Sequence, residues 1–321
     1  MPVMFNEHTP LAWIVFNLGI LGILAFDLFL FHRQPREIPV REALRATAVY
    51  VALALCFNAW IYWQSGEAKA IQFLTGYFIE YALSMDNILV FVVILAYFQV
   101  PSELQMRVLL WGILGSVVLR AIFILAGLAL IEAFDWTIIV LGFFLIYTGI
   151  KTIKTGDEPK DLQKSRIVRA VRLFIPVTAG YHGQKLFTRR SGIAFATPLF
   201  LVLVVLSVTD ILFAFDSIPA VFAITRDPFI VYTSNVFAVL GLRALYFALS
   251  GMIDKFRYLK FGLSLVLIFI GIKMIYNYLP WPDIPTEWAL AVTAALIFGS
   301  IAASLIWGGN GDEEGPASRP Q

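Results

Sequence analysis

Charged side chains are scarce in this sequence. Only 14% of its 321 residues are Asp, Glu, Lys or Arg, whereas a soluble domain carries about 25%. Hydrophobic residues make up 60% of the chain, and the mean hydropathy is +0.80. Burial of a hydrophobic core in a soluble protein does not require so few charged residues, but contact of the chain with lipid hydrocarbon does. We therefore expect a lipid bilayer around the chain and no nucleic acid as a partner.

Cysteine and histidine are also rare. The lone cysteine, Cys56, excludes disulfides within the chain and thiolate-rich metal sites. The three histidines, His8, His32 and His182, lie outside the middle of every long apolar run. The sequence has no haem-spaced histidine pair, dinucleotide-binding motif or ATP-binding signature. We expect no enzymatic activity, no organic cofactor and no direct coupling to ATP.

Long apolar runs occupy most of the chain. A bilayer core needs about 20 apolar residues per helix, and the first run lacks the basic leading segment that is typical of a cleaved signal peptide. The pattern predicts an all-α membrane protein with about nine transmembrane helices. The predicted spans are residues 11–31, 46–63, 71–98, 108–131, 136–153, 193–224, 229–252, 261–279 and 288–307.

Basic residues gather in alternate loops. In a nine-span arrangement almost all loop lysines and arginines lie on one side, and the other side has only Lys69 and Arg226. Because cytoplasmic loops are enriched in Lys and Arg, the N-terminus is predicted outside and the C-terminus in the cytoplasm. We expect a multi-pass protein of the cytoplasmic (inner) membrane of a bacterium.

Two polar segments interrupt the apolar pattern. Residues 155–192 form a long basic loop on the cytoplasmic side, and apolar residues alternate with arginines over 165–177. This alternation predicts a basic amphipathic helix on the inner leaflet. Residues 308–321 are polar and rich in Gly and Pro, which predicts a disordered cytoplasmic tail.

The chain contains an internal repeat. Three collinear matches relate 80–88 to 210–218 at an offset of 130, 119–121 to 242–244 at 123, and 149–153 to 271–275 at 122. The residues that align are the rare polar ones. We assign the three helices of residues 71–154 to a first repeat and the three helices of residues 193–280 to a second. The remaining helices, in residues 1–70 and 281–307, are assigned to the periphery.

Three spans per repeat make the two copies opposite in orientation, because an odd number of crossings returns the chain to the other side. Inverted repeats are common in secondary transporters, which bind substrate at the repeat interface near the midplane. Duplication kept only for packing is the alternative, but it leaves the acidic residues of the repeat unexplained.

Four carboxylates lie well inside predicted spans, namely Glu80, Asp86, Asp210 and Asp216. Each costs about 2.5–3.5 kcal/mol at a helix centre, so together they oppose insertion by on the order of 10 kcal/mol. Protonation, pairing with arginine, water or a bound cation must offset this cost.

Amide and hydroxyl side chains accompany the acids. Asn87 follows Glu80 by seven residues, and Ser217 follows Asp210 by seven, so each pair lies on nearly the same helix face. An all-oxygen ligand set suits a hard cation such as Mg²⁺, Ca²⁺ or Mn²⁺. The sequence therefore predicts one intramembrane site for a divalent cation, formed by Glu80, Asp86, Asn87, Asp210, Asp216 and Ser217.

The second acid of each motif follows the first by six residues, which is about 120° around an ideal helix. Both acids of one motif reach one ion only if the helix is locally unwound or the site lies inside a bundle. We expect a helix distortion near Asp86 and another before Pro219.

Arg120 and Arg243 are repeat-related cations within the predicted spans. Two interpretations stay open for them. Either they form structural ion pairs with the acids, or they exchange partners during transport and keep the unloaded site neutral.

At these residues the chain resembles the TerC family of integral membrane proteins, particularly its pH-responsive Alx branch. The resemblance covers about residues 11–307, and the segments that carry it are 80–87, 196–200, 209–220 and the Gly-Ile-Lys segments at 149–151 and 271–273. It implies export of manganese(II) across the cytoplasmic membrane. Older descriptions of the family imply tellurium-ion resistance or membrane redox modulation.

Export of Mn²⁺ in exchange for protons is the leading hypothesis, because carboxylates hold either a proton or a metal ion. The alternative is a membrane scaffold or assembly factor in metal or tellurium-ion resistance or in redox modulation. Such a protein would depend on the basic loop more than on the acids.

Overall fold

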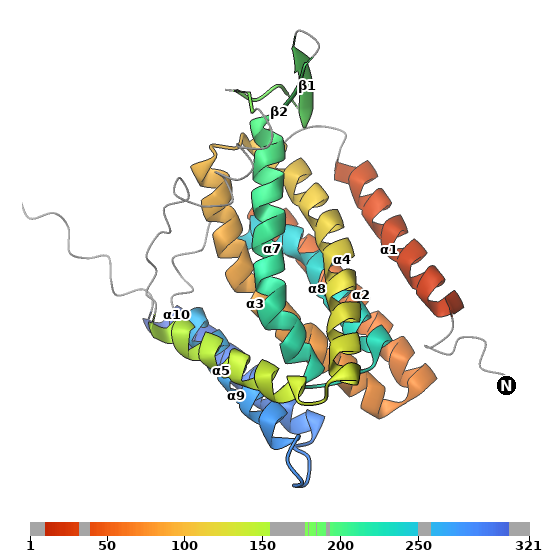
Figure 1. Ribbon diagram of the computed structural model, residues 1–321. Helices are drawn as coiled ribbons and strands as arrows, with labels where there is room; N and C mark the ends of the chain where they lie inside the picture. The colour runs from red at the N-terminus through yellow and green to blue at the C-terminus, as the bar shows by residue number, and fades with distance from the viewer. Residues whose placement is uncertain are drawn as a thin grey trace, which may run out of the picture.

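The computed structural model describes residues 10–31, 39–154, 177–178, 180–183, 185–190, 193–249 and 258–307. Within them, nine long helices form most of the structure (Figure 1). Eight of these are long and apolar enough to cross a bilayer, and α1 has a shorter apolar stretch, Pro10–Phe26. The all-α membrane class and the existence of nine helices are therefore confirmed. The helices are α1 (Pro10–Phe31), α2 (Val40–Ser65), α3 (Glu67–Tyr97), α4 (Ser102–Ala133), α5 (Thr137–Lys154), α7 (Pro198–Phe222), α8 (Pro228–Leu249), α9 (Leu259–Tyr276) and α10 (Thr286–Trp307).

The sixth predicted span starts too early. Strand β2 (Ile193–Ala196) pairs antiparallel with β1 (Phe187–Arg190), and the hairpin lies beyond the N-terminal end of α7 (Figure 1). Pro198 is the first residue of α7, and a residue that precedes proline is disfavoured in the helical region. The predicted start at residue 193 is therefore wrong, and the boundary drawn between 192 and 193 divides the hairpin.

Both helices that carry an acidic motif are continuous, α3 from Glu67 to Tyr97 and α7 from Pro198 to Phe222. Pro219 lies in the last turn of α7, where its missing N–H removes only one intrahelical hydrogen bond. An intact helix also keeps its other backbone groups bonded within the bilayer. The predicted distortions near Asp86 and before Pro219 are therefore wrong.

The basic loop is described only in its last part. The amphipathic helix predicted at 165–177, apart from Val177, and the tail at 308–321 lie outside the described residues. In the described part, the Tyr181 hydroxyl donates a hydrogen bond to the carbonyl oxygen of Phe98 at 2.8 Å. The loop before α7 therefore lies on the same side of the protein as the connection between α3 and α4.

Helices α3, α4, α7 and α8 pack together as the core of the protein. α3 and α8 run parallel: Lys69, in the first turn of α3, forms an ion pair with Asp227, which directly precedes α8. About two turns further along both helices, Gly76 lies against Ser234, and a Cβ on this glycine would be 3.0 Å from the serine hydroxyl. Parallel α3 and α8 agree with the alternating directions of the predicted spans.

α4 and α7 form the matching parallel pair. Ser116 on α4 donates a hydrogen bond to Asp210 on α7, and nearer the ends of both helices Gly127 packs against the Phe222 ring. The sequence repeat relates α3 to α7 and α4 to α8. Exchange of the two copies therefore turns the α3–α8 pair into the α7–α4 pair. The core therefore has the internal symmetry expected of the sequence repeat.

The repeat-related helices α5 and α9 cross antiparallel at glycines. A Cβ on Gly271 would lie 2.6 Å from the carbonyl oxygen of Gly142, and a Cβ on Gly149 would lie 2.7 Å from that of Ser264. The offset of 122 that relates Gly149 to Gly271 also relates Gly142 to Ser264. Exchange of the repeats thus maps one contact onto the other, as a twofold axis in the membrane plane requires.

α8 is the innermost helix, since its whole apolar stretch is buried. It contacts α2, α3 and α4, and α1 packs on it through Trp13, which stacks on Tyr232. α2 and α10 bury only 17% and 22% of their apolar stretches. Their exposed apolar faces suit contact with lipid.

The glycine contact between α5 and α9 gives a test of this packing. Gly271→Ala should lower the thermal unfolding midpoint of the purified protein, because its Cβ meets backbone that cannot rotate away, and overpacking costs about 1–3 kcal/mol. Gly112→Ala on α4 is the matched control, since no atom lies within 4 Å of its Cβ position and alanine favours helix. An unchanged midpoint for Gly271→Ala would contradict the close crossing.

Candidate functional site

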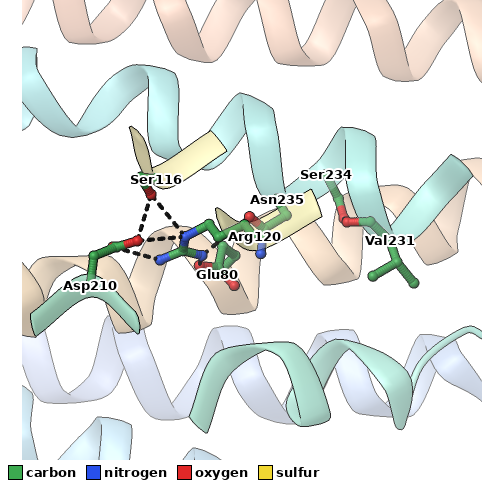
Figure 2. A network of polar contacts seen from close by, with 7 residues as sticks. All are labelled: Glu80, Ser116, Arg120, Asp210, Val231, Ser234 and Asn235. Carbon is green, nitrogen blue, oxygen red and sulfur yellow. Dashed lines mark hydrogen bonds and ion pairs between the residues drawn. The ribbon is translucent and has the colours of Figure 1, made fainter. Parts of the chain in front are cut away.

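Arg120 lies where the four core helices meet (Figure 2). It projects from α4 and is only 1% exposed. Its guanidinium donates five hydrogen bonds, to side chains of α3, α4, α7 and α8. This arrangement makes Arg120 the centre of the candidate site.

Asp210 on α7 accepts two of these bonds. Nη2 of Arg120 lies 3.1 Å from Oδ1, and Nε lies 3.3 Å from Oδ2, so the guanidinium and the carboxylate face each other in a fork. Ser116, one turn before Arg120 on α4, donates its hydroxyl to Oδ2 at 2.5 Å and accepts a bond from Nε at 3.2 Å. Asp210 is only 3% exposed.

Glu80 on α3 is the second carboxylate at Arg120. It is fully buried, and its Oε1 forms an ion pair with Nη1 of Arg120. The same Nη1 donates to Oδ1 of Asn235 on α8 at 3.2 Å. Oε2 of Glu80 is buried and has no hydrogen-bond partner among the described residues. One half of this carboxylate is therefore available to a further cation or donor.

The cluster carries an excess of negative charge. One guanidinium and two carboxylates sum to −1 when all three are ionised, and all three groups are almost fully buried. Breaking such a buried pair by removing one partner typically costs about 3–5 kcal/mol, because the other charge stays buried. Arg120 is thus the group that offsets much of the insertion cost of Glu80 and Asp210.

Repeat symmetry explains which acids meet. Glu80 and Asp210 are equivalent at the offset of 130, and both bind the same arginine. One acid from each repeat therefore bonds to the same guanidinium, and the role of these two acids as metal ligands stays a prediction. The ion pairs of Arg120 are observed directly. Its repeat equivalent, Arg243, is also buried, on α8.

For the remaining predicted site residues, no contact with Arg120 is described. Asn87 and Ser217 are buried, and the Ser217 hydroxyl has no hydrogen-bond partner among the described residues. Asp216 is half-buried on α7, and Asp86 lies in α3, with a side chain outside those described. The described residues contain no cluster of three or more His, Cys, Asp or Glu side chains. A single cation site made by all six residues stays a prediction.

Ser116 and Asn235 are site residues that the sequence did not reveal. Neither has a polar equivalent in the other repeat: the offset of 123 relates Ser116 to Val239 and Gly112 to Asn235. A search for polar residues common to both repeats therefore passes over them. The spacing of Ser116 four residues before Arg120, on the same helix face, was the one available signal.

Comparison with known proteins gives the family. The model of the integral membrane protein TerC family matches residues 65–311. An uncharacterized membrane protein of Myxococcus xanthus is 46% identical over 93% of this chain and 93% of its own length. Proteins of Escherichia coli strain K12 and Salmonella typhi, each named "Putative membrane-bound redox modulator Alx", are 41% and 40% identical over 94% of this chain and 95% of their own lengths.

No solved structure matches the chain. The family model covers most of the sequence, including both acidic motifs and both repeats. The described helices are those of a multi-pass membrane protein. The chain belongs to the TerC family of integral membrane proteins.

Proposed function

We propose that this protein is a secondary transporter that exports Mn²⁺ from the cytoplasm of a bacterium through an acidic site between its two inverted repeats. One observation carries the proposal: repeat-related carboxylates, Glu80 and Asp210, converge in the protein interior at the interface of the repeats. Inverted-repeat transporters bind their substrate at this place.

Charge supports a divalent substrate. Within the predicted spans 71–98, 108–131, 193–224 and 229–252, the core helices carry four carboxylates (Glu80, Asp86, Asp210 and Asp216) and two arginines (Arg120 and Arg243). Four negative and two positive charges sum to −2, which one divalent cation neutralises. Such balance matters because unpaired charge is costly within hydrocarbon.

The kind of ligand supports manganese or another hard cation. Carboxylate, amide and hydroxyl oxygens surround Arg120, and the described core offers no thiolate. Hard oxygen sites favour Mg²⁺, Ca²⁺ and Mn²⁺, and the family resemblance selects manganese among them. Because the same carboxylates bind protons, inward proton flow is the driving force that we assign to export.

Loss of an acid tests this function. Asp86→Asn, Asp210→Asn and Asp216→Asn should each raise cellular manganese and lower manganese tolerance at least about tenfold in cells that depend on this protein. Asp135→Asn is the matched control, because Asp135 is exposed in the turn between α4 and α5. Membrane levels of each variant are measured in parallel. Wild-type tolerance in all three variants, at equal protein levels, would end the transport proposal.

Orientation is a separate prediction. With the N-terminus outside and the C-terminus in the cytoplasm, alkaline phosphatase fused after residue 321 should be inactive and a fluorescent protein fused there should fluoresce. Fusions after Phe134, between α4 and α5, should give the opposite pattern, because the loop there carries no basic residue. An active phosphatase at the C-terminus would reverse the assignment.

Redox modulation is the second candidate, because the printed name of the relatives points to it. The one cysteine, Cys56, is exposed on α2, remote from Arg120 in the sequence and on a peripheral helix. An optical spectrum of the purified protein separates the candidates. Haem or flavin bands that respond to dithionite would favour the redox role over transport.

A further inference from the structure

We propose that Arg120 is a tethered competitor of the transported cation, which occupies Glu80 and Asp210 in this conformation and releases them as the divalent ion enters. The inference rests on the proposed transport function and assigns Arg120 as the residue that couples loading of the site to a change of partners. It goes beyond a static ion pair, which would hold the same contacts throughout.

The first support is the position of the guanidinium. It bonds to one carboxylate from each repeat, with Glu80 on one nitrogen and Asp210 on two. A divalent cation that bridged the repeats would use the same two carboxylates. Arg120 and such an ion therefore cannot both keep their full contacts with these acids.

The second support is incomplete neutralisation. With all three groups ionised the cluster has a net charge of −1, and Oε2 of Glu80 is buried with no hydrogen-bond partner among the described residues. Buried polar atoms are normally satisfied, and a carboxylate oxygen in a medium of low dielectric attracts a cation strongly. An entering ion therefore finds a first ligand at this oxygen before Arg120 moves.

The third support is a neutral resting place for the arginine. Nε of Arg120 donates to the Ser116 hydroxyl at 3.2 Å, and Nη1 donates to Asn235 Oδ1 at 3.2 Å. These two bonds do not involve the carboxylates, so they remain possible when the acids bind a metal ion. Ser116 and Asn235 thus lower the cost of releasing both acids from Arg120.

The Arg120 cluster is almost closed to solvent, so the guanidinium rather than water must compensate the charge of the acids. Arg120, Glu80 and Asp210 are nearly inaccessible to solvent, and beside Asp210 and Ser116 is a cavity of only about 10 Å³ with apolar walls from Phe91, Leu109 and Leu206. Few waters can screen the charges at this site. Release of the ion is then assisted by the return of the guanidinium, which replaces part of the lost positive charge.

Removal of the competing charge gives the decisive test. Arg120→Gln should bind Mn²⁺ at least about tenfold more tightly than wild type in equilibrium dialysis of the purified protein. Transport in proteoliposomes should fall at least about tenfold, because the ion leaves more slowly. Arg120→Lys, which keeps the positive charge, should bind at least about threefold more weakly than Arg120→Gln. Arg107→Gln, on the same helix but outside the cluster, should have wild-type affinity.

The outcomes separate this inference from the proposed function. If wild type shows no Mn²⁺ binding that Asp210→Asn abolishes, the transport proposal fails and the inference fails with it. If binding depends on Asp210 but Arg120→Gln binds no more tightly, only the competitor role is overturned. Should Arg120→Gln fail to give a folded protein, Asn235→Ala decides: loss of the neutral acceptor should weaken Mn²⁺ binding at least about threefold, and unchanged affinity overturns the inference.

Discussion

The cost of burying charge in hydrocarbon is the constraint on which this protein depends. Glu80 and Asp210 lie in the interior, and one arginine bonds to both. Each charge alone would oppose insertion of its helix. Together they bind α3, α4 and α7 to one another, and Asn235 extends the network to α8. The same interaction therefore stabilises the core and, in the transport function that we propose, leaves negative charge for a cation.

Inverted symmetry positions these groups, but it does not make the halves identical. Lys151 and Lys273 are equivalent at the offset of 122. Lys151 is exposed and lies 5.8 Å from the ring centroid of Tyr147, whereas Lys273 is buried and donates to the carbonyl oxygen of Ala223 at 2.9 Å, at the end of α7. Equivalent residues thus have different partners in the two repeats.

The packing of the helices separates two kinds of contact. α5 and α9 meet through glycines at backbone distance, so little side-chain adjustment is available there. Around Arg120, by contrast, the contact among α3, α4, α7 and α8 is made by long or polar side chains with alternative hydrogen-bond partners. A change of partners at Arg120 therefore requires smaller backbone movement than a change at the glycine crossing.

The sequence by itself determined the membrane class, the number of helices and the inverted repeat, and it singled out Glu80, Asp210 and Arg120 as charged residues within the spans, because few polar residues are tolerated in hydrocarbon and each one is informative. It misplaced the start of α7, because Pro198 begins the helix and the apolar residues before it form a strand. It also predicted helix breaks that do not exist, because Pro219 lies in the last turn of α7, where a proline does not interrupt the helix. Only the tertiary structure decided which acids share an arginine, and that Ser116 and Asn235 join them. Those contacts join different helices, and the spacing of residues along one helix does not show which helix packs against it.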